Sequence, residues 1–159
     1  MRRTAATLAT LLLAGAAALA PHTAASADDL PGPTITAPLV GVRGWCLEVR
    51  DGSTADSTPV QAWDCNGSAA QRWRLGVDGT LQALGKCLDV RHGGTRPGTP
   101  VGIHDCNGTA AQQWQFLGNA TFYNPQSGRC LNVPLGAAGV ELNIWYCFGD
   151  DTQRWRFAI

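Results

Sequence analysis

The six cysteines are the side chains of this sequence with the widest chemistry, because thiols can oxidise to disulfides or bind metal ions as thiolates. A metal site has little support, since there is no C-x-x-C motif and only His92 and His104 stand outside the N-terminal leader. The second cysteine of each pair recurs every 41 residues, so each copy of a repeated unit is expected to close its own loop. This register predicts three disulfides: Cys46 with Cys65, Cys87 with Cys106, and Cys130 with Cys147.

Residues for acid, base or nucleophilic catalysis are scarce. Outside the leader there are two glutamates, Glu48 and Glu141, and the two histidines. The H-E-x-x-H and G-x-S-x-G motifs are absent, and the predicted pairing leaves no free cysteine. We therefore predict a protein that is not an enzyme and that needs no metal or cofactor. A pair of acidic residues acting on a glycosidic bond stays open on this inventory alone.

The cysteines belong to a longer pattern that is written three times. Each copy reads Cys-Leu-x-Val, a loop, a second cysteine, and eight residues later a tryptophan that ends Gln-x-Trp. The tryptophans Trp73, Trp114 and Trp155 are spaced 41 residues apart, and we predict that they form the core. A fixed period of this size indicates one supersecondary unit whose copies bury their apolar faces against each other.

The N-terminus reads as a secretion signal. Arg2 and Arg3 precede an apolar run too short to span a bilayer, and Ala25-Ser26-Ala27 forms an A-x-A cleavage site, which predicts a signal peptide over 1–27. The remaining chain has ten basic against twelve acidic side chains, so its formal charge is −2. Because nucleic-acid binding requires clustered basic residues, we expect no nucleic-acid partner. We also expect no membrane insertion, and we predict a secreted, extracellular protein.

Short segments with alternating apolar residues fill each repeat. Leu47 and Val49 alternate before the first loop, and Val60 and Ala62 alternate after it, and turn residues such as Asp51-Gly52 separate such segments. Period-two alternation indicates strands, so the fold class is predicted to be all-β with about four strands in each unit. A propeller is the alternative for this period, but three units are too few to close one.

These motifs resemble the ricin-type β-trefoil lectins, whose three subdomains repeat C-L-D-V, a cysteine-bounded loop and Gln-x-Trp. The resemblance implies a β-trefoil of three repeats with pseudo-threefold symmetry. It covers residues 33–159 after an N-terminal arm at 28–32, with repeats at about 33–75, 76–116 and 117–159.

The same resemblance implies which side chains contact sugar. A pyranose needs an aromatic ring for its C–H face and a carboxylate with amides for its hydroxyls. The candidates in the first repeat are Glu48, Gln61, Trp63, Asn66 and Gln71. Those in the second are Asp89, His104 and Asn107, and those in the third are Asn132, Asn143 and Trp145.

Every repeat departs from the family pattern. Ala70 and Ala111 stand where the family has asparagine, Gly102 replaces glutamine, and Asn132 replaces the carboxylate. Two functions remain. The first is a secreted carbohydrate-binding lectin domain for galactose-like or xylose-like sugars or polysaccharides, with shallow multivalent sites. The second is a degenerate trefoil that acts as a protein-interaction or inhibitor scaffold without sugar binding.

Overall fold

A computed structural model describes residues 35–159, which form twelve short strands and several single-turn 3-10 helices. The expected signal peptide, the arm at 28–32 and the first two residues of the expected domain lie outside the described residues.

Each repeat contributes four strands, as the apolar alternation predicts. The first repeat has β1 (Thr36–Val40), β2 (Cys46–Val49), β3 (Thr58–Trp63) and β4 (Arg72–Leu75). The second has β5 (Leu81–Ala83), β6 (Lys86–Val90), β7 (Val101–His104) and β8 (Gln115–Phe116). The third has β9 (Phe122–Asn124), β10 (Arg129–Asn132), β11 (Asn143–Trp145) and β12 (Arg156–Phe157).

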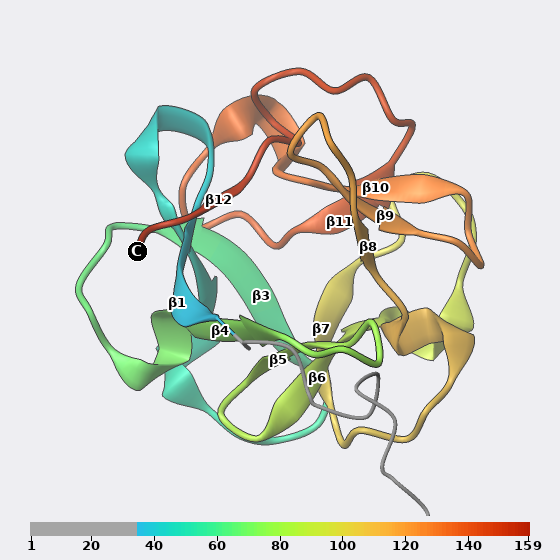
Figure 1. Ribbon diagram of the computed structural model, residues 1–159, viewed down its shortest axis with the longest axis horizontal. Coiled ribbons are helices and arrows are strands. Elements are labelled where there is room, and N and C mark those ends of the chain that lie inside the picture. Colours follow the sequence, from blue (N-terminus) through green and yellow to red (C-terminus); the bar gives the residue numbers. More distant parts are fainter. Residues whose placement is uncertain (1–34) are drawn as a thin grey trace, which may run out of the picture. The chain divides into compact units, whose positions relative to one another are not determined.

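The outer strands of the repeats form a closed ring. Antiparallel pairs join β1 to β4, β4 to β5, β8 to β9 and β12 to β1. The two remaining gaps are bridged by the hydrogen bond from Trp114 N to Gly79 O and by the pair Thr121 with Arg154. The ring is the barrel of a β-trefoil, seen with its three lobes in Figure 1.

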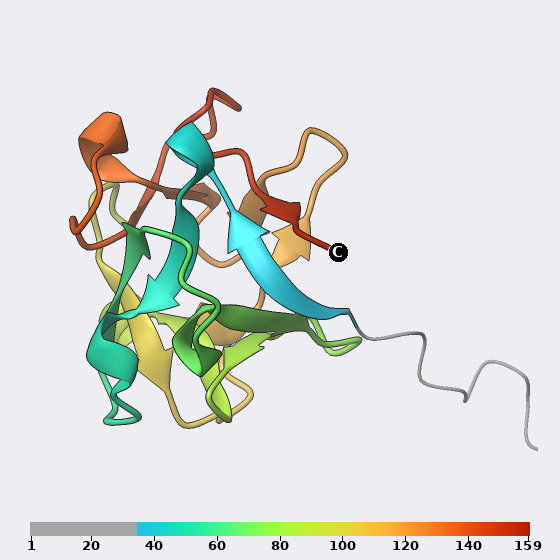
Figure 2. The same ribbon diagram turned by 90° about the vertical axis from the view of Figure 1, so that its left-hand side faces the viewer.

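Three hairpins cap one end of this barrel. They are β2 with β3, β6 with β7, and β10 with β11, and they meet through the pairs Thr58 with Ile103, Pro100 with Asn143, and Gln61 with Glu141. Figure 2 shows the hairpins on one side and β1 and β12 of the barrel on the other. The contact between hairpins places a residue of one repeat beside the strand end of the next.

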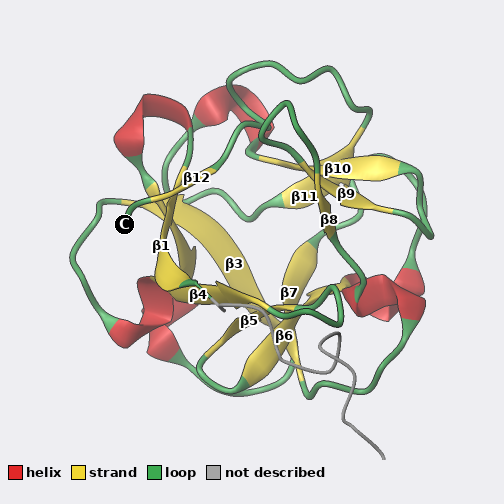
Figure 3. Cartoon of the chain, viewed as in Figure 1, coloured by secondary structure: helices red, strands yellow, loops and turns green. Residues whose placement is uncertain are grey.

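The 3-10 helices lie around the periphery of the trefoil, in the connections between the strands (Figure 3). Three of them follow β2, β6 and β10: η3 (Arg50–Gly52), η5 (Arg91–Gly93) and η7 (Pro134–Gly136). Two others precede the Gln-x-Trp tryptophans, namely η4 (Ala69–Gln71) and η6 (Ala110–Gln112), and η2 (Val42–Gly44) follows β1. No described helix has the length and apolar character needed to cross a membrane.

The Gln-x-Trp indoles are core, as predicted. Trp73, Trp114 and Trp155 are buried. The indole of Trp73 donates to Leu47 O at 2.8 Å, and that of Trp114 donates to Leu88 O at 3.0 Å. Each bond ties the tryptophan to the Cys-Leu strand of its own repeat. The indole N–H of Trp155 has no partner in the described part of the chain, so the third repeat lacks this link.

The predicted disulfide pairing is confirmed. The bonded pairs are Cys46–Cys65, Cys87–Cys106 and Cys130–Cys147. Each bridge fastens the loop that follows the second hairpin strand to the start of the first, and closing loops of this length is worth about 3 kcal/mol each in unfolded-chain entropy. The bridges therefore hold the rim loops in place.

Candidate functional site

The candidate residues form three separate sites, one at each cap hairpin. In each, a large side chain ends the second hairpin strand and points away from the core, while a polar residue of the first strand lies beneath it. Ala62 is buried whereas the next residue, Trp63, is 43% exposed, because successive residues of a strand face opposite sides. We call the hollows site 1 (Glu48, Gln61, Trp63, Asn66), site 2 (Asp89, Gly102, His104, Asn107) and site 3 (Asn132, Asn143, Trp145), after the repeats.

Site 1 is built around the carboxylate of Glu48. This side chain is only 7% exposed, and three amides donate to it. Gln61 Nε2 lies 3.1 Å from Oε1, while Gln71 Nε2 and Asn66 Nδ2 lie 2.7 and 3.2 Å from Oε2. Asn66 therefore bonds the carboxylate in a repeat where Ala70 replaces the asparagine of the family. The hollow above has a volume of about 690 Å³, with Trp63 on its wall.

Gln71 lies behind Glu48 and holds the loop after the second cysteine. Its Nε2 donates to Asp64 O at 2.8 Å, and its Oε1 accepts from Asn66 N at 2.8 Å. Gln112 and Gln153 make the equivalent bonds in their own repeats. The glutamine of Gln-x-Trp thus fixes the rim loop, and in sites 1 and 2 it also donates to the carboxylate.

Arg50 is a residue of site 1 that the sequence analysis missed. Its Nε donates to Gln61 Oε1 at 2.9 Å, which turns the amino group of Gln61 toward Glu48. Its Nη2 donates to Gly139 O at 3.3 Å, and Gly139 belongs to the third repeat. The recurrence of arginine after Cys-Leu-x-Val, as Arg50 and Arg91, was the available signal.

A residue from a neighbouring repeat completes the wall of site 1. Gly139 N donates to Ala62 O at 2.8 Å, and a Cβ at Gly139 would lie 2.9 Å from Trp63 Cζ3. Gly139 has φ of 73°, a left-handed conformation that glycine adopts without strain. The indole of Trp63 therefore packs against the backbone of Gly139.

The other two sites repeat this contact with different residues. Gly98 N donates to Ile144 O at 2.8 Å, and a Cβ at Gly98 would lie 3.4 Å from Trp145 Cζ3. At site 2 the corresponding residue is Ser57, with φ of 65°, and its N donates to Ile103 O at 2.8 Å. The residue at this position of the neighbouring repeat is thus glycine beside each of the two tryptophans and serine at the site of the smaller His104.

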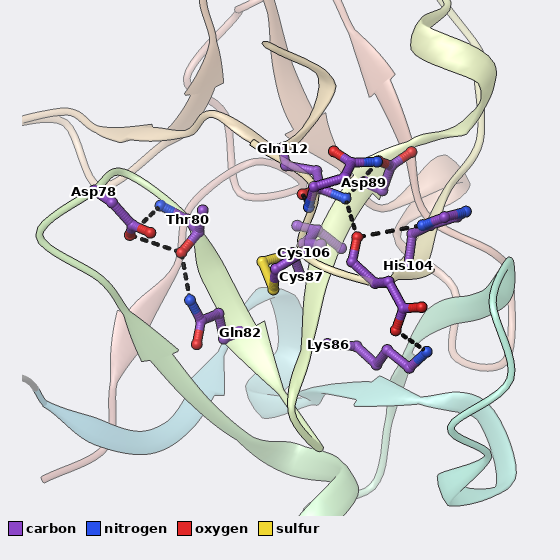
Figure 4. Close-up of a disulfide and its surroundings, with 12 residues drawn as sticks. Asp78, Thr80, Gln82, Lys86, Cys87, Asp89, His104, Cys106 and Gln112 are labelled. Carbon is purple, nitrogen blue, oxygen red and sulfur yellow. Dashed lines mark hydrogen bonds and ion pairs between the residues drawn. A yellow bond between two sulfur atoms is a disulfide. The ribbon is translucent and has the colours of Figure 1, made fainter. Parts of the chain in front are cut away.

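Site 2 is a hollow of about 450 Å³ around Asp89. Gln112 Nε2 donates to Asp89 Oδ2 at 3.0 Å, and Figure 4 shows both side chains beside the disulfide of Cys87 and Cys106. Burial raises the pKa of the Asp89 carboxyl, against a smaller lowering by Gln112. With one amide donor where Glu48 has three, Asp89 keeps more lone pairs for a ligand.

The missing glutamine of site 2 has a packing cause. A Cβ at Gly102 would lie 2.8 Å from Thr58 O and 3.4 Å from Arg91 Nε, so the adjoining hairpin leaves little room for a side chain. Arg91 Nε has no partner among the described residues, although Arg91 Nη2 donates to Ser57 O at 2.8 Å. The arginine is therefore held by Ser57 of the first repeat and by an ion pair with Glu141 of the third repeat, rather than by a glutamine.

Charged side chains surround His104 at the rim of site 2. Asp56, from the first repeat, has Oδ2 3.6 Å from His104 Nε2 and accepts from Lys86 Nζ at 2.8 Å. This hydrogen bond lowers the pKa of the Asp56 carboxyl. Asn107 closes the rim, and its Oδ1 accepts from Thr109 N at 3.0 Å.

Site 3 is smaller, about 310 Å³, and holds its polar residues in amide contacts. Asn132 Nδ2 donates to Asn143 Oδ1, and Thr152 Oγ1 contacts Asn132 Oδ1, both at 3.0 Å. Trp145 is 37% exposed. Phe148 also lines the hollow, and the sequence analysis missed it.

Comparison with known proteins agrees with this architecture. The family model for the ricin-type beta-trefoil lectin domain matches residues 36–155. Volkensin from Adenia volkensii is 39% identical over 128 residues, which cover 79% of this chain and 24% of volkensin. A glucan endo-1,3-beta-glucosidase from Cellulosimicrobium cellulans is 62% identical over 93 residues, covering 58% of this chain and 17% of that protein. The chain thus spans a quarter or less of the length of these relatives.

A solved structure of a related protein has the same fold as this chain. It is that of a non-toxic homologue of type II RIPs from Momordica charantia, in complex with alpha-methyl-D-galactoside. The TM-score is 0.73 at 25% identity, over 79% of this chain and 48% of the other. With its three disulfide-closed repeats, barrel and capping hairpins, this chain belongs to the ricin-type β-trefoil lectin family, a family of carbohydrate-binding domains.

Proposed function

We propose that this chain is a secreted carbohydrate-binding protein that holds galactose-like or xylose-like sugars, or their polysaccharides, through shallow sites that act together. The observation that carries the proposal is site 1, where the half-exposed ring of Trp63 stands beside a buried carboxylate. A sugar ring can stack on the indole while its hydroxyls point to Glu48 and Gln61.

The hydrogen bonds around Glu48 fit this role. An ionised carboxylate has about four acceptor positions, and three are taken by amides. The remaining position accepts a sugar hydroxyl, and Gln61 and Asn66 flank it. Because the amides fix the carboxylate before a ligand arrives, little side-chain entropy is lost on binding.

Several weak sites on one molecule favour binding to a polymeric ligand over binding to a single sugar. A site with one ring and two or three polar groups is expected to bind with about millimolar affinity, near −4 kcal/mol. Simultaneous contact of two or three sites with one polysaccharide raises the apparent affinity by about 10² or more without a new contact. The three sites lie at three different hairpins, which favours a ligand that branches or wraps.

Secretion is supported by the three disulfides, since such bonds form in oxidising compartments. The signal peptide expected over 1–27 provides the export route. The galactoside complex of the Momordica charantia homologue supports galactose-like ligands, and the residues of site 1 offer the ring and the polar groups that such a sugar needs.

Retention on galactose-bearing resin and on insoluble xylan tests the proposal. We expect the protein to bind at least one of these supports, with free sugar eluting it at about millimolar concentration. Trp63→Ala should weaken retention while leaving the thermal unfolding midpoint nearly unchanged. If a glycan array and both supports retain neither protein, the sugar-binding proposal is wrong, and a protein-interaction or inhibitor scaffold is the function to test.

A further inference from the structure

Exposed arginines gather along one side of the barrel. They flank the buried Gln-x-Trp tryptophans of the first and third repeats, as Arg72, Arg74, Arg154 and Arg156. The strands β4 and β12, which contain or adjoin these arginines, pair with β1 on its two sides (Figure 2). The fold therefore brings together arginines that the sequence keeps in separate repeats. The second repeat has Gln113 and Gln115 at the corresponding positions, so its segment adds no charge.

Two of these arginines line a hollow between the third and first repeats. Arg154 and Arg156 contribute from the third repeat, and Arg43 contributes from the turn after β1, around a volume of about 310 Å³. We call it the arginine hollow. Gly41 also lines it, and a Cβ there would lie 2.7 Å from Trp155 Cζ3. The first repeat therefore presents backbone rather than a side chain at this part of the wall.

The guanidinium group of Arg156 is not used by the fold. Arg156 lies opposite Val40, an apolar residue, and it has no hydrogen bond or ion pair within residues 35–159. Arg74 is the equivalent residue of the first repeat, and it donates to Gln82 Oε1. The third repeat has kept the arginine while its partner strand offers no acceptor. Its donors are therefore free for a ligand.

The other charges of the hollow leave it positive. Arg43 Cζ lies 5.8 Å from the centroid of the Trp45 ring, a contact that orients the guanidinium without occupying its N–H donors. Asp151 is the carboxylate that lines the hollow, and its Oδ1 lies 3.6 Å from Arg154 Nη1. Three positive side chains thus meet one negative side chain, which favours an anionic ligand.

The arginine hollow adjoins site 3. A Cβ at Gly136 would lie 3.7 Å from Thr152 Cγ2 and 3.8 Å from Val42 Cγ2. Thr152 lines site 3, whereas Val42 lines the arginine hollow. The consecutive residues Asp150 and Asp151 line the two hollows in the same way. A polymer that leaves site 3 can therefore continue into the arginine hollow across this short border.

We propose that the arginine hollow binds the anionic groups of an acidic polysaccharide, either carboxylates of uronic acids or sulfate esters. Arg43 and Arg156 donate to the anionic oxygens, which match the planar fork of a guanidinium group. This inference rests on the proposed function and adds a charged ligand class to it. The border with site 3 favours a polysaccharide over a nucleic acid, whose phosphates the same arginines would attract.

Pairs of polymers that differ only in charge test the inference. The parent should bind polygalacturonate about tenfold more tightly than its methyl ester, since charge-assisted hydrogen bonds are gained. A sulfated galactan against the same galactan after desulfation tests the sulfate form. Added salt should reduce both preferences, because exposed charges are screened.

The chain supplies matched variants. Arg156→Gln gives the third repeat the residue that the second has as Gln115, and the side chain is exposed, so the thermal unfolding midpoint should hardly change. This variant should reduce the preference for the charged polymer to about threefold, and R43Q/R156Q should abolish it. Arg96→Gln is the control, because it removes an exposed arginine that does not line the hollow, and it should keep the full preference.

Equal binding of the charged and neutral polymers, or a preference that survives in R43Q/R156Q, would overturn the inference while the lectin function stands. An equal loss in Arg96→Gln would show a response to net charge alone and would overturn it too. Binding of polyglutamate or single-stranded DNA as tightly as the acidic polysaccharides would have the same consequence. A parent that binds none of these polysaccharides and no neutral sugar contradicts both the inference and the proposed function. A response to carboxylate or to sulfate alone supports the inference and identifies the anionic group.

Discussion

The trefoil contains two sets of bulky side chains, and they differ in how strictly the three repeats agree. The inner set, Trp73, Trp114 and Trp155, is tryptophan in every repeat and is buried. The outer set at the hairpin ends changes from Trp63 to His104 to Trp145. The inner indoles are enclosed by the barrel core, whereas the outer side chains have solvent on one side.

The outer set depends on the neighbouring repeat. Gly139 and Gly98 leave room for the indoles of Trp63 and Trp145, while Ser57 stands next to His104. Each site is therefore shared by two repeats, and a change in one repeat alters the site of the next. The comparison predicts that inner substitutions affect stability and outer substitutions affect binding.

The largest effect is expected for Trp73→Ala. The side chain is fully buried and its indole bonds Leu47 O, so its removal should lower the free energy of unfolding by about 3 to 5 kcal/mol. Chemical denaturation followed by circular dichroism measures the change. A loss below about 1 kcal/mol would show that the inner ring is not the core.

Trp63→Ala should separate binding from stability. The half-exposed ring loses its stacking contact, which should weaken sugar binding at site 1 by about 1 to 3 kcal/mol with little change in unfolding. Calorimetric titration with the sugar found by array gives the affinity. We expect site 1 to bind unsubstituted sugars best, so Trp145→Ala and Asp89→Ala should weaken such binding less. The reverse order would contradict this ranking of the sites.

The inner set was predictable from sequence and most of the outer geometry was not. The period of 41 residues predicts the disulfides and the buried tryptophans because both repeat in register and act within one unit. Period-two alternation also predicts that Trp63 points outward from Ala62. These features depend on local spacing, which a sequence shows directly.

The contacts between repeats depend on folding. Nothing in the spacing of Gly139 reveals that it lies against Trp63, since 76 positions separate them in the chain. Asn66, by contrast, was expected in site 1 from its place after Cys65, and its bond to Glu48 lies within one repeat. Leu135 stood in the sequence as an ordinary apolar residue, and its left-handed, exposed conformation emerges only in the structure.

A tryptophan-to-phenylalanine pair tests whether the inner set is as uniform as its burial suggests. Trp73→Phe removes a hydrogen bond and leaves Leu47 O without its partner, whereas Trp155 Nε1 has no partner to lose among residues 35–159. Trp73→Phe should therefore cost about 1 to 2 kcal/mol more than Trp155→Phe in denaturant unfolding. Equal costs would mean that the two indoles are equivalent in solution.

Gly139→Ala tests the sharing of site 1 between repeats. The variant should lose about 1 kcal/mol of stability through backbone strain, and the added Cβ should also displace Trp63 and weaken sugar binding. Gly85→Ala is the matched control, because Gly85 has φ of 74° and its Cβ would meet nothing within 4 Å. Similar stability losses but a binding loss only in Gly139→Ala would support the shared site. Unchanged sugar affinity and indole fluorescence in Gly139→Ala would argue against it.

The smallest expected effect is the pH dependence of stability from Asp89. Burial raises the pKa of its carboxyl in the folded protein above the unfolded value, so the folded state binds the proton more tightly. Stability from this group is therefore fully present below the unfolded pKa, near 4, and is lost as the pH rises through the folded pKa. Asp89→Asn removes the ionisation and keeps an oxygen for Gln112, so the variant should gain stability relative to the parent as the pH rises from about 3 to 7. Denaturant midpoints across that range measure the difference.

Asp78→Asn is the control, and its pH dependence of stability should have the opposite sign. The hydroxyl of Thr80 lowers the pKa of the Asp78 carboxyl, so Asp78→Asn should lose stability relative to the parent over the same rise in pH. If both variants follow one trend, burial at site 2 does not control the charge of Asp89.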